Sequence, residues 1–419
     1  MMLHEVLLIM LALSPLSIFR VFRRPLELSY PLLILVLSIF QGDYSEKVLG
    51  SAGVSLVFDE SSRIFMMASA LVFAMVALKR RDEGFRESFL FLTSLITLSA
   101  IYLSNDLFNV YVLMEVLSVQ AGLMALDRRN PSTLWATLKY LLIGGIGANL
   151  YLVGVAIYYS AHGTFEIGLE VPQIARVFMA VGMMMRVGVF GFGMWLPQFH
   201  SRVHNELSAL FSGAFVGGGI FPAMKIFGGL HFTVYLSIGG ALVAVLSSDY
   251  KRILAGSTMG HVGAMLSFQN PSLYFLSHSV SKAFLFLTSE EVKRGEMTWP
   301  GYISALVSFA SLSAFPMTVG GVAESGLDPL LKLSTVLSSS AVFSKISRVK
   351  PRGFSLSPVF LIPILVLVRP SPVSLLPLLA LAGVFLKTGE NVEIPLEGIE
   401  WNVAMSTLFL AGWLVWSGH

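Results

Sequence analysis

Cysteine is absent from the 419-residue sequence. This absence excludes disulfide bonds, thiolate metal sites and iron–sulfur ligation by the chain itself, because all of them require cysteine sulfur. Any redox chemistry connected with the chain therefore belongs to a partner, and we expect no cofactor and no catalytic chemistry here. His200 and His204, which we expect in the loop after Pro197, are spaced like two metal ligands. No third ligand is evident, so no metal site is predicted.

Charged residues are also scarce. They make up 13% of the chain, against about 25% in soluble globular proteins, whereas hydrophobic residues make up 55%. The mean hydropathy is +0.76. These values exclude a soluble globular fold and predict an all-α polytopic membrane protein embedded in a lipid bilayer. The net charge of +3 does not indicate nucleic-acid binding, because the excess Lys and Arg residues fall in short loops.

Long hydrophobic runs follow one another from end to end, and no polar stretch is long enough for a soluble domain. We expect about 14 to 16 transmembrane helices, some of them short or interrupted by proline. The first begins with His4 and Glu5 and lacks a cleavage site, so we interpret it as a retained helix. The predicted spans are residues 3–19, 28–41, 62–78, 87–104, 106–126, 133–159, 172–195, 206–229, 231–247, 252–268, 272–289, 300–323, 327–345, 356–369, 371–387 and 401–417.

Lys and Arg residues are concentrated in alternate loops between these spans. Because basic loops stay on the cytoplasmic side, this pattern predicts a multi-pass protein of the cell membrane with its N-terminus outside. The basic set comprises Arg20, Arg23, Arg24, Lys79, Arg80, Arg81, Arg86, Arg128, Arg129, Lys251, Arg252, Lys293, Arg294, Lys345, Arg348, Lys350 and Arg352.

Two spans are interrupted by glycine and proline. They are predicted to break near residues 186–197 and 316–324. Paired interrupted helices at corresponding positions indicate an inverted-repeat transporter. Two inverted repeats of five helices each are therefore expected. The predicted division is residues 1–85 for N-terminal helices, 86–230 and 231–347 for the repeats, and 348–419 for C-terminal helices.

Glu115 lies almost at the centre of the span Leu107–Leu126, near the bilayer midplane. A carboxylate there costs about 2.5 to 3.5 kcal/mol, which makes an ion or proton pathway the leading interpretation. The alternative is an ion pair that orients helices. Tyr111, Ser118 and Gly122 share its helix face. The other ionisable residues at membrane depth are Arg186, Lys225, His261, His278, Lys282 and Glu324.

Simpler roles explain other polar residues. His261 is expected to be a packed, hydrogen-bonded histidine, and Glu324 has the alternative of a helix end in contact with water. Asp106 is expected to cap a helix N-terminus, and Asp249 to stand at another. Asp59 receives no role.

Six segments carry a family resemblance: DLFNVYVLME, KYLLIGGIGANLYLVGVAIYYSAHGT, WLPQFHSRVHNELSALFSG, SSDYKRILAGSTMGHVG, LSHSVSKAFLFL and FPMTVGGVAE. In this order, from about residue 55 to 325, the chain resembles the large subunits of Mrp-type cation/proton antiporters. It also resembles the related antiporter-like subunits of respiratory complex I and membrane-bound hydrogenases. The resemblance implies a 14-helix core with a half-channel in each repeat, and a chain that works with other membrane subunits.

The resemblance also assigns positions. Glu115 matches the family's glutamate of the fifth helix, Lys282 its lysine of the eleventh, and His278 the histidine one turn before. Arg186 replaces the lysine of the seventh helix, and Glu324 occupies the Lys-or-Glu position of the twelfth. The Lys-or-His of the eighth helix corresponds to Gly217 or Ser212, and Lys225 lies where the family often has an arginine.

The replacement of lysine by Arg186 has a chemical consequence. A guanidinium group stays protonated in proteins, whereas a buried lysine can release its proton. Arg186 is therefore expected to be a fixed counter-charge to Glu115 and not a proton carrier.

The leading hypothesis is an antiporter-like subunit that moves H⁺, with Na⁺ as a second candidate. It would belong to a Mrp-type antiporter or to a redox-driven complex of the hydrogenase or complex I type. The rival is a partly degenerate, non-conducting paralogue that acts as a scaffold, favoured in the first half by Arg186 and Gly217. An independent solute transporter is disfavoured, because the sequence has no substrate-cavity signature.

Overall fold

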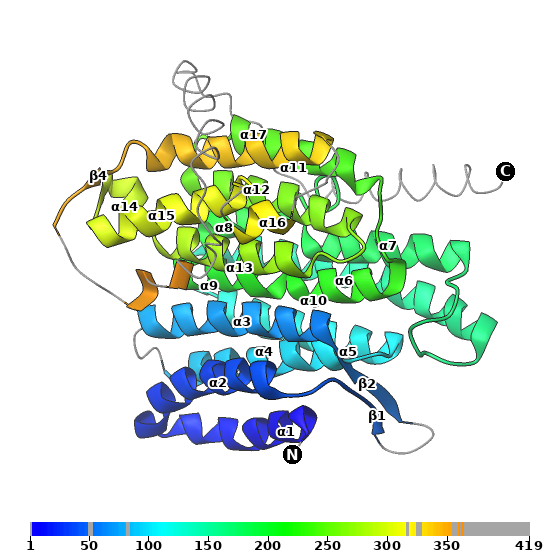
Figure 1. The fold of residues 1–419 in the computed structure, drawn as a ribbon. Coiled ribbons are helices and arrows are strands. Elements are labelled where there is room, and N and C mark those ends of the chain that lie inside the picture. Colours follow the sequence, from blue (N-terminus) through cyan, green and yellow to red (C-terminus); the bar gives the residue numbers. More distant parts are fainter. Residues whose placement is uncertain are drawn as a thin grey trace.

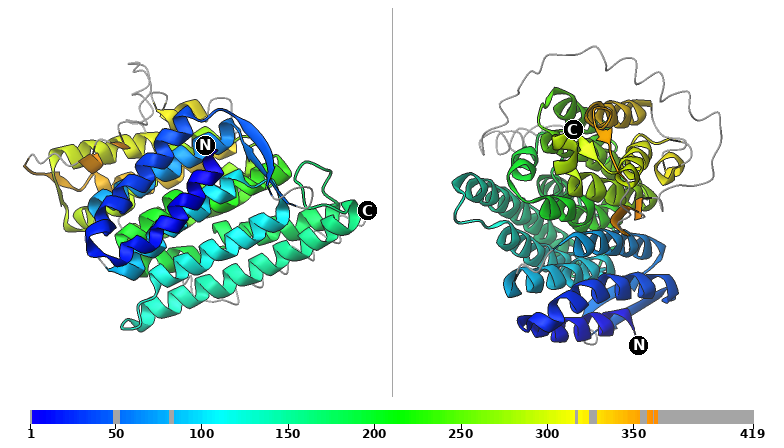
Figure 2. Two further views of the ribbon diagram at one scale, coloured as in Figure 1. Left: turned by 90° about the horizontal axis from the view of Figure 1, so that it is seen from below. Right: turned by 90° about the vertical axis from the view of Figure 1, so that its left-hand side faces the viewer.

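The computed structural model describes residues 2–48, 53–80, 84–315, 318–323, 329–353, 358–360 and 362–363. Within them the chain is a bundle of helices that lie side by side, from α1 at one edge to α17 at the other (Figure 1). Figure 2 shows the same helices from below and along their axes. The all-α expectation is confirmed for these helices, and the C-terminal spans predicted after residue 363 lie outside the described residues.

The N-terminal layer differs from the prediction at the start of its second helix. The helix α2 begins at Arg20 rather than residue 28, so Arg20, Arg23 and Arg24 are helical and not loop residues. The physical reason is that Arg23 Nε donates to the carbonyl oxygen of Ser17 at 2.9 Å, which satisfies the end of the preceding turn. The elements of this layer are α1 (Leu3–Leu13), η1 (Ser14–Ile18) and α2 (Arg20–Phe40).

A β-hairpin follows α2, and the sequence did not predict it. The strands β1 (Tyr44–Val48) and β2 (Val54–Phe58) pair antiparallel, with Tyr44 opposite Phe58. Near the other end of the chain, β3 (Glu296–Met297) and β4 (Lys350–Pro351) form a short parallel pair. Both are small additions to a helical bundle.

Polar caps begin the next helices. The Asp59 side chain accepts from the backbone N–H of Ser62 at 2.9 Å, and Asp106 accepts from that of Asn109 at 2.7 Å, so the predicted capping role of Asp106 is confirmed. Asn130 caps the longest helix in the same way. These helices are α3 (Glu60–Lys79), α4 (Phe85–Leu103), α5 (Leu107–Ala125) and α6 (Pro131–His162).

The predicted break near residues 186–197 is confirmed. The helix α7 (Gln173–Val187) ends at Gly188, whose φ of +81° favours glycine, and α8 (Trp195–Arg202) begins seven residues later. A Cβ on Gly193 would lie 2.1 Å from the Cα of Gly188, so the turn between the helices needs glycine at both positions. The next span consists of α9 (Asn205–Leu210), a π-helical turn η3 (Phe211–Phe215) and α10 (Gly217–Phe227).

The remaining helices contain a second break. The helix α15 ends at Leu312 and α16 begins at Val319, so the chain leaves the helix before the predicted position at residue 316. Glu324 lies outside the described residues. The elements here are α11 (Thr233–Leu246), α12 (Tyr250–Ser267), α13 (Ser272–Leu287), α14 (Ser289–Arg294), α15 (Trp299–Leu312), α16 (Val319–Ala323), α17 (Pro329–Ile346) and η4 (Pro358–Phe360).

Five helical segments of the described chain are long and apolar enough to span a membrane by themselves, and the others are shorter or broken. The five are Glu60–Lys79, Phe85–Leu103, Leu107–Ala125, Pro131–His162 and Asn205–Phe227.

Helix connections lie alternately at two ends of the bundle. One end, which we call the basic end, has the loops after α3, α5 and α11 together with α14, on the left in Figure 1. There Lys79 Nζ donates to the carbonyl oxygen of Leu287 at 2.8 Å, and Lys293 lies 3.4 Å from Asp249. The opposite end, the hairpin end, has the β-hairpin and the loops after α4 and α6. These two loops are joined there by an isolated antiparallel β-bridge between the backbones of Asp106 and Glu166.

Candidate functional site

The first half of the bundle contains the predicted pair Glu115 and Arg186. Arg186 Nη1 donates to Glu115 Oε1 at 2.8 Å, so the expected pairing is confirmed. Glu115 lies in the middle of α5, and Arg186 lies in the last turn of α7, directly before the break. The break therefore positions the guanidinium group at the depth of the carboxylate.

Buried aromatic side chains pack around the break between α7 and α8. Trp195 Nε1, at the start of α8, donates to the carbonyl oxygen of Met185 at 3.1 Å. The Tyr140 ring lies 4.9 Å from the Trp195 ring, and Tyr140 Oη donates to Ser118 Oγ at 3.2 Å. Ser118 was expected on the face of Glu115, and its hydrogen bond connects that face to α6. These hydrogen bonds and ring contacts join α5, α6 and α7 around the ion pair.

Lys139 is a buried ionisable residue that sequence reasoning missed. It lies in α6, is 5% exposed, and its Nζ donates to Gln198 Oε1 of α8 at 2.8 Å. In the sequence, Lys139 comes directly before an apolar run, and a lysine in that position is ordinarily taken for one at the exposed start of a membrane helix. Only the position of α8 reveals that the ammonium group points into the bundle.

In the second half, His278 and Lys282 lie one turn apart on α13 and are 1% and 0% exposed. Lys282 Nζ donates to the carbonyl oxygen of Leu254 on α12 at 3.0 Å. Among the described residues, no carboxylate pairs with this lysine. An ammonium ion without a counter-charge is costly inside a membrane, so this lysine is a candidate for function rather than for packing alone.

Two further contacts complete this cluster. His278 Nε2 lies 3.2 Å from the carbonyl oxygen of Ser212, which belongs to the π-helical turn where the regular hydrogen-bond pattern is interrupted. His261 is 1% exposed, its Nδ1 lies 3.0 Å from Tyr274 Oη, and its ring centroid lies 5.4 Å from that of His278. The structure therefore brings His261, His278 and Lys282 together, with His261 packed and hydrogen bonded as expected.

Gly217 occupies a position between the two halves. A Cβ there would lie 2.3 Å from Tyr102 Oη and 2.4 Å from the Phe275 ring, so the space is filled by aromatic side chains. A titratable side chain has no room at this position.

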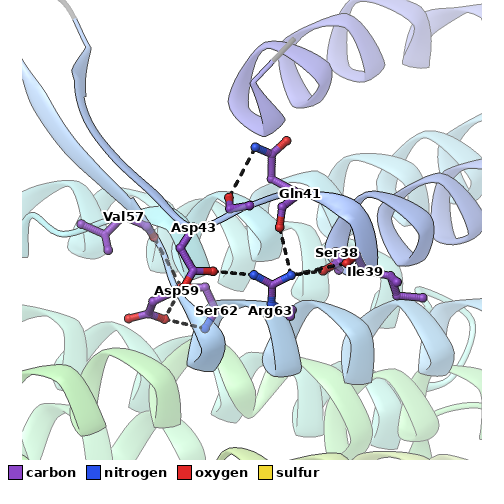
Figure 3. A network of polar contacts seen from close by, with 9 residues as sticks. Ser38, Ile39, Gln41, Asp43, Val57, Asp59, Ser62 and Arg63 are labelled. Carbon is purple, nitrogen blue, oxygen red and sulfur yellow. Dashed lines mark hydrogen bonds and ion pairs between the residues drawn. The ribbon is translucent and has the colours of Figure 1, made fainter.

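Lys225 does not join either group. Its ammonium group contacts the carboxylate of Asp59, the N-cap of α3, and lies 5.5 Å from the Phe221 ring centroid. The sequence assigned no role to Asp59, because its partner is distant in the chain. The same corner holds Arg63, which pairs with Asp43 and donates to backbone carbonyls at the end of α2 (Figure 3). These contacts attach the β-hairpin to the hairpin end of the bundle.

The interpretation of His200 as a loop residue was wrong. Pro197 lies in the first turn of α8, where proline is tolerated, so the helix continues and His200 is 0% exposed. Its ring stacks on that of Phe286 at 4.6 Å. His204 is exposed at the start of α9, and the described residues contain no group of three possible metal ligands.

The helix α16 ends at Ala323, directly before Glu324 in the sequence. A Cβ on Gly320 would lie 1.9 Å from the carbonyl oxygen of Ser311, and Ser311 Oγ lies 2.6 Å from Ser277 Oγ. The same Cβ would lie 2.9 Å from Ser277 Oγ, so α16 packs closely against the end of α15 and against α13 at Ser277.

The sequence that forms the two broken helices and the two groups of buried ionisable residues matches a known protein family. Residues 104–360 match the family described as the transmembrane region of NADH:quinone oxidoreductases and Mrp antiporters. The chain belongs to this family. The match begins just before Glu115 and includes both clusters, and the resemblance identified from the six motifs is confirmed.

Similar curated proteins come from diverse prokaryotes. An uncharacterised protein of Methanocaldococcus jannaschii is 26% identical over 321 residues, which cover 66% of this chain and 65% of that protein. A Na(+)/H(+) antiporter component of Alkalihalophilus pseudofirmus is 26% identical over 306 residues, covering 62% of each. A NADH-quinone oxidoreductase component of Acidithiobacillus ferrooxidans is 30% identical over 267 residues, covering 55% and 54%. The chain thus spans less than two thirds of each relative.

Solved structures share the fold. A chain of respiratory complex I from Thermus thermophilus has a TM-score of 0.67 and 18% identity, covering 98% of this chain and 97% of that one. A chain of the archaeal membrane-bound sulfane sulfur reductase has 0.71 and 17%, with the same coverage. A chain of the Mrp complex from Dietzia sp. DQ12-45-1b has 0.71 and 19%, covering 98% and 55%. The fold is therefore that of an antiporter-like membrane subunit.

Proposed function

We propose that the chain is an antiporter-like subunit that translocates H⁺, with Na⁺ as a second candidate, in a multi-subunit membrane complex. The observation that carries this proposal is Lys282, fully buried beside His278 with a backbone carbonyl as its hydrogen-bond partner. An amine in this setting binds or releases a proton when a neighbouring charge moves. Membership of the family and the antiporter component among its relatives support the same function.

We further propose that the second half carries the ion. Arginine side chains keep their proton in proteins, so the guanidinium group of Arg186 acts as a fixed charge. Its pairing with Glu115 therefore supports a fixed charge pair in the first half rather than a proton carrier. The tight packing around Gly217 supports the same division. Nothing in the comparisons specifically favours the scaffold alternative.

Two inverted repeats, residues 86–230 and 231–347, are part of the proposal. The helix α7 starts at the hairpin end and continues through its break to the basic end, whereas α15 starts at the basic end and runs the opposite way. Opposite directions of the two broken helices are what an inverted repeat requires.

Other membrane subunits are the proposed partners. The Glu115 side chain is 36% exposed in the isolated chain although it lies in a membrane-spanning helix. A carboxylate in contact with lipid is costly, so this face of α5 is better covered by protein. The relatives that are named as subunits of antiporters and oxidoreductases support this arrangement.

The proposed location is the cell membrane, with the basic end in the cytoplasm. The helix α1 begins at the hairpin end, so its N-terminus would lie outside. The support is the concentration of Lys and Arg residues at one end of the bundle.

The test is proton flux through the assembled complex in liposomes. Lys282→Ala is expected to lower the flux at least about tenfold while the complex still assembles. The matched control is Lys332→Ala, which removes an exposed lysine of α17. Normal flux through fully assembled Lys282→Ala complex would contradict the proposed function.

A further inference from the structure

His200 differs from the other buried histidines by its lack of hydrogen bonds. Both of its ring nitrogens have no partner among the described residues, although the side chain is 0% exposed. His261, by contrast, is within hydrogen-bonding distance of Tyr274 and Ser338 through its two nitrogens. A histidine that serves packing alone is normally hydrogen bonded, so the bare nitrogens of His200 require another explanation.

The position of His200 connects it to Lys282. Its ring stacks on Phe286, which lies one helical turn after Lys282 on α13, toward the basic end. His200 therefore lies just beyond Lys282 on the way from the centre of the bundle to the basic end.

Lys251 lies further along the same line. It stands in the first turn of α12 and is 4% exposed, and its Nζ donates to the carbonyl oxygen of Val203 at 2.6 Å. Val203 directly follows the last residue of α8 and lies three residues after His200. On α12, Lys251 is one turn before Leu254, whose carbonyl binds Lys282. The end of α8 thus contacts the lysine-bearing turn of α12 through Val203 and the last turns of α13 through the His200 ring.

Additional buried polar atoms without partners accompany these residues. They belong to α12, α13 and the start of α14, and they have no hydrogen-bond partner in the described part of the chain. Polar atoms of this kind commonly bind buried water. The atoms are Ser257 Oγ, His278 Nδ1, Ser281 Oγ and Ser289 Oγ.

The outer end of this line reaches the surface. Asp249, the N-cap of α12, lies 3.4 Å from Lys293 of α14, and their side chains are 35% and 39% exposed. Asp249 is two residues before Lys251, so the buried lysine lies next to an exposed ion pair at the basic end.

We propose that His200 is a proton relay between Lys282 and the basic end of the bundle, with Lys251 as the residue that positions α8 beside α12. The proposal rests on the proposed function and specifies one access route of the second half. In the relay, a proton from water at the basic end binds one ring nitrogen, and the other ring nitrogen releases its proton through water to the Lys282 amine. The ring then rotates about its Cβ–Cγ bond to restore the first arrangement of N–H and bare nitrogen, so one proton passes from the basic end to Lys282 in each cycle.

The decisive variant is His200→Phe in the complete complex, because phenylalanine keeps the stacking on Phe286 and removes both nitrogens. We expect normal assembly and at least about a tenfold loss of proton flux in liposomes. The matched control is His204→Phe, four residues later and exposed, with flux within about twofold of the unmodified complex. A smaller loss in assembled His200→Phe complex overturns the relay.

A second variant and a second readout keep the test decisive. If His200→Phe does not assemble, His200→Gln replaces it, because glutamine is polar but does not titrate, and the same tenfold criterion applies. The pH profile of the remaining flux should also change, since a purely structural histidine would lower flux equally at all pH values. Loss of flux in Lys282→Ala with normal flux in the His200 variants would overturn the relay alone. Normal flux in both would overturn the proposed function.

Discussion

Arg186 and Glu115 are 71 residues apart in the sequence and connect α7 to α5 through a 2.8 Å contact between Nη1 and Oε1. The guanidinium group enters this contact from the last helical turn before a glycine break. The contact keeps two opposite charges at the same depth of the bundle, where either charge alone would be costly.

This relationship predicts the behaviour of Arg186 variants. Arg186→Ala should impair folding or assembly, because an unpaired buried charge costs about 3 to 5 kcal/mol, and less here since Glu115 is partly exposed. Arg186→Lys should be tolerated, because it keeps the charge. The yield of assembled complex measures both effects. In Arg186→Gln, a large loss of proton flux with normal assembly would show that Arg186 belongs to a working pathway and not to a fixed pair.

A second prediction concerns the acidic residue after α16. Glu324→Ala should lower ion translocation far more than assembly, because Glu324 directly follows α16, which packs on α13 at Ser277, one turn before Ser281 and Lys282. Flux in vesicles that contain equal amounts of assembled complex is the measurement. The control is Glu60→Ala, which removes an exposed acid in the first turn of α3. Equal flux in both variants would remove Glu324 from the pathway.

The glycine break makes a third prediction possible. Gly193→Ala places a methyl group 2.1 Å from the Gly188 backbone, so the turn must open. Overpacking of this kind costs about 1 to 3 kcal/mol or more, and we expect a lower melting temperature of the purified complex. Gly145→Ala is the control, because no atom lies within 4 Å of its new Cβ. An unchanged melting temperature in Gly193→Ala would mean that the break is not rigid.

A fourth prediction concerns the hairpin and pH. Burial raises the pKa of the Asp59 carboxyl, but the Lys225 ammonium and the Ser62 hydrogen bonds outweigh it, so the pKa lies below its usual value. The stabilisation is therefore complete above the usual pKa of about 3.9 and is lost as the pH falls through the lower folded value. Asp59→Asn should release the hairpin at neutral pH, measured as faster proteolysis at residues 44–58. Equal proteolysis of Asp59→Asn and the unmodified protein would contradict this role.

The absence of cysteine allows a fifth prediction on orientation. A membrane-impermeant maleimide should label Ser45→Cys, on the exposed hairpin, in intact cells. It should label Arg129→Cys, at the basic end, only after the membrane is permeabilised. The unmodified chain has no cysteine and is the control. The reverse labelling pattern would mean that the basic end faces outward.

The sequence by itself determined the features that depend on local composition. Hydropathy gives the spans because each must cross the same apolar layer, and the glycine-rich segment after Arg186 gives the break because few other residues adopt its turn. The pairing of Glu115 with Arg186 was predictable because few charges are available at that depth.

Only the tertiary structure decided which distant side chains meet. The contact of Asp59 with Lys225 joins residues 166 positions apart, and no local pattern records it. His200 looks like a loop histidine after Pro197, and it is buried because α8 packs against α12 and α13. The cost of a charge in a membrane is fixed by its depth, which the sequence reveals, whereas its partner is fixed by helix packing, which depends on the whole fold.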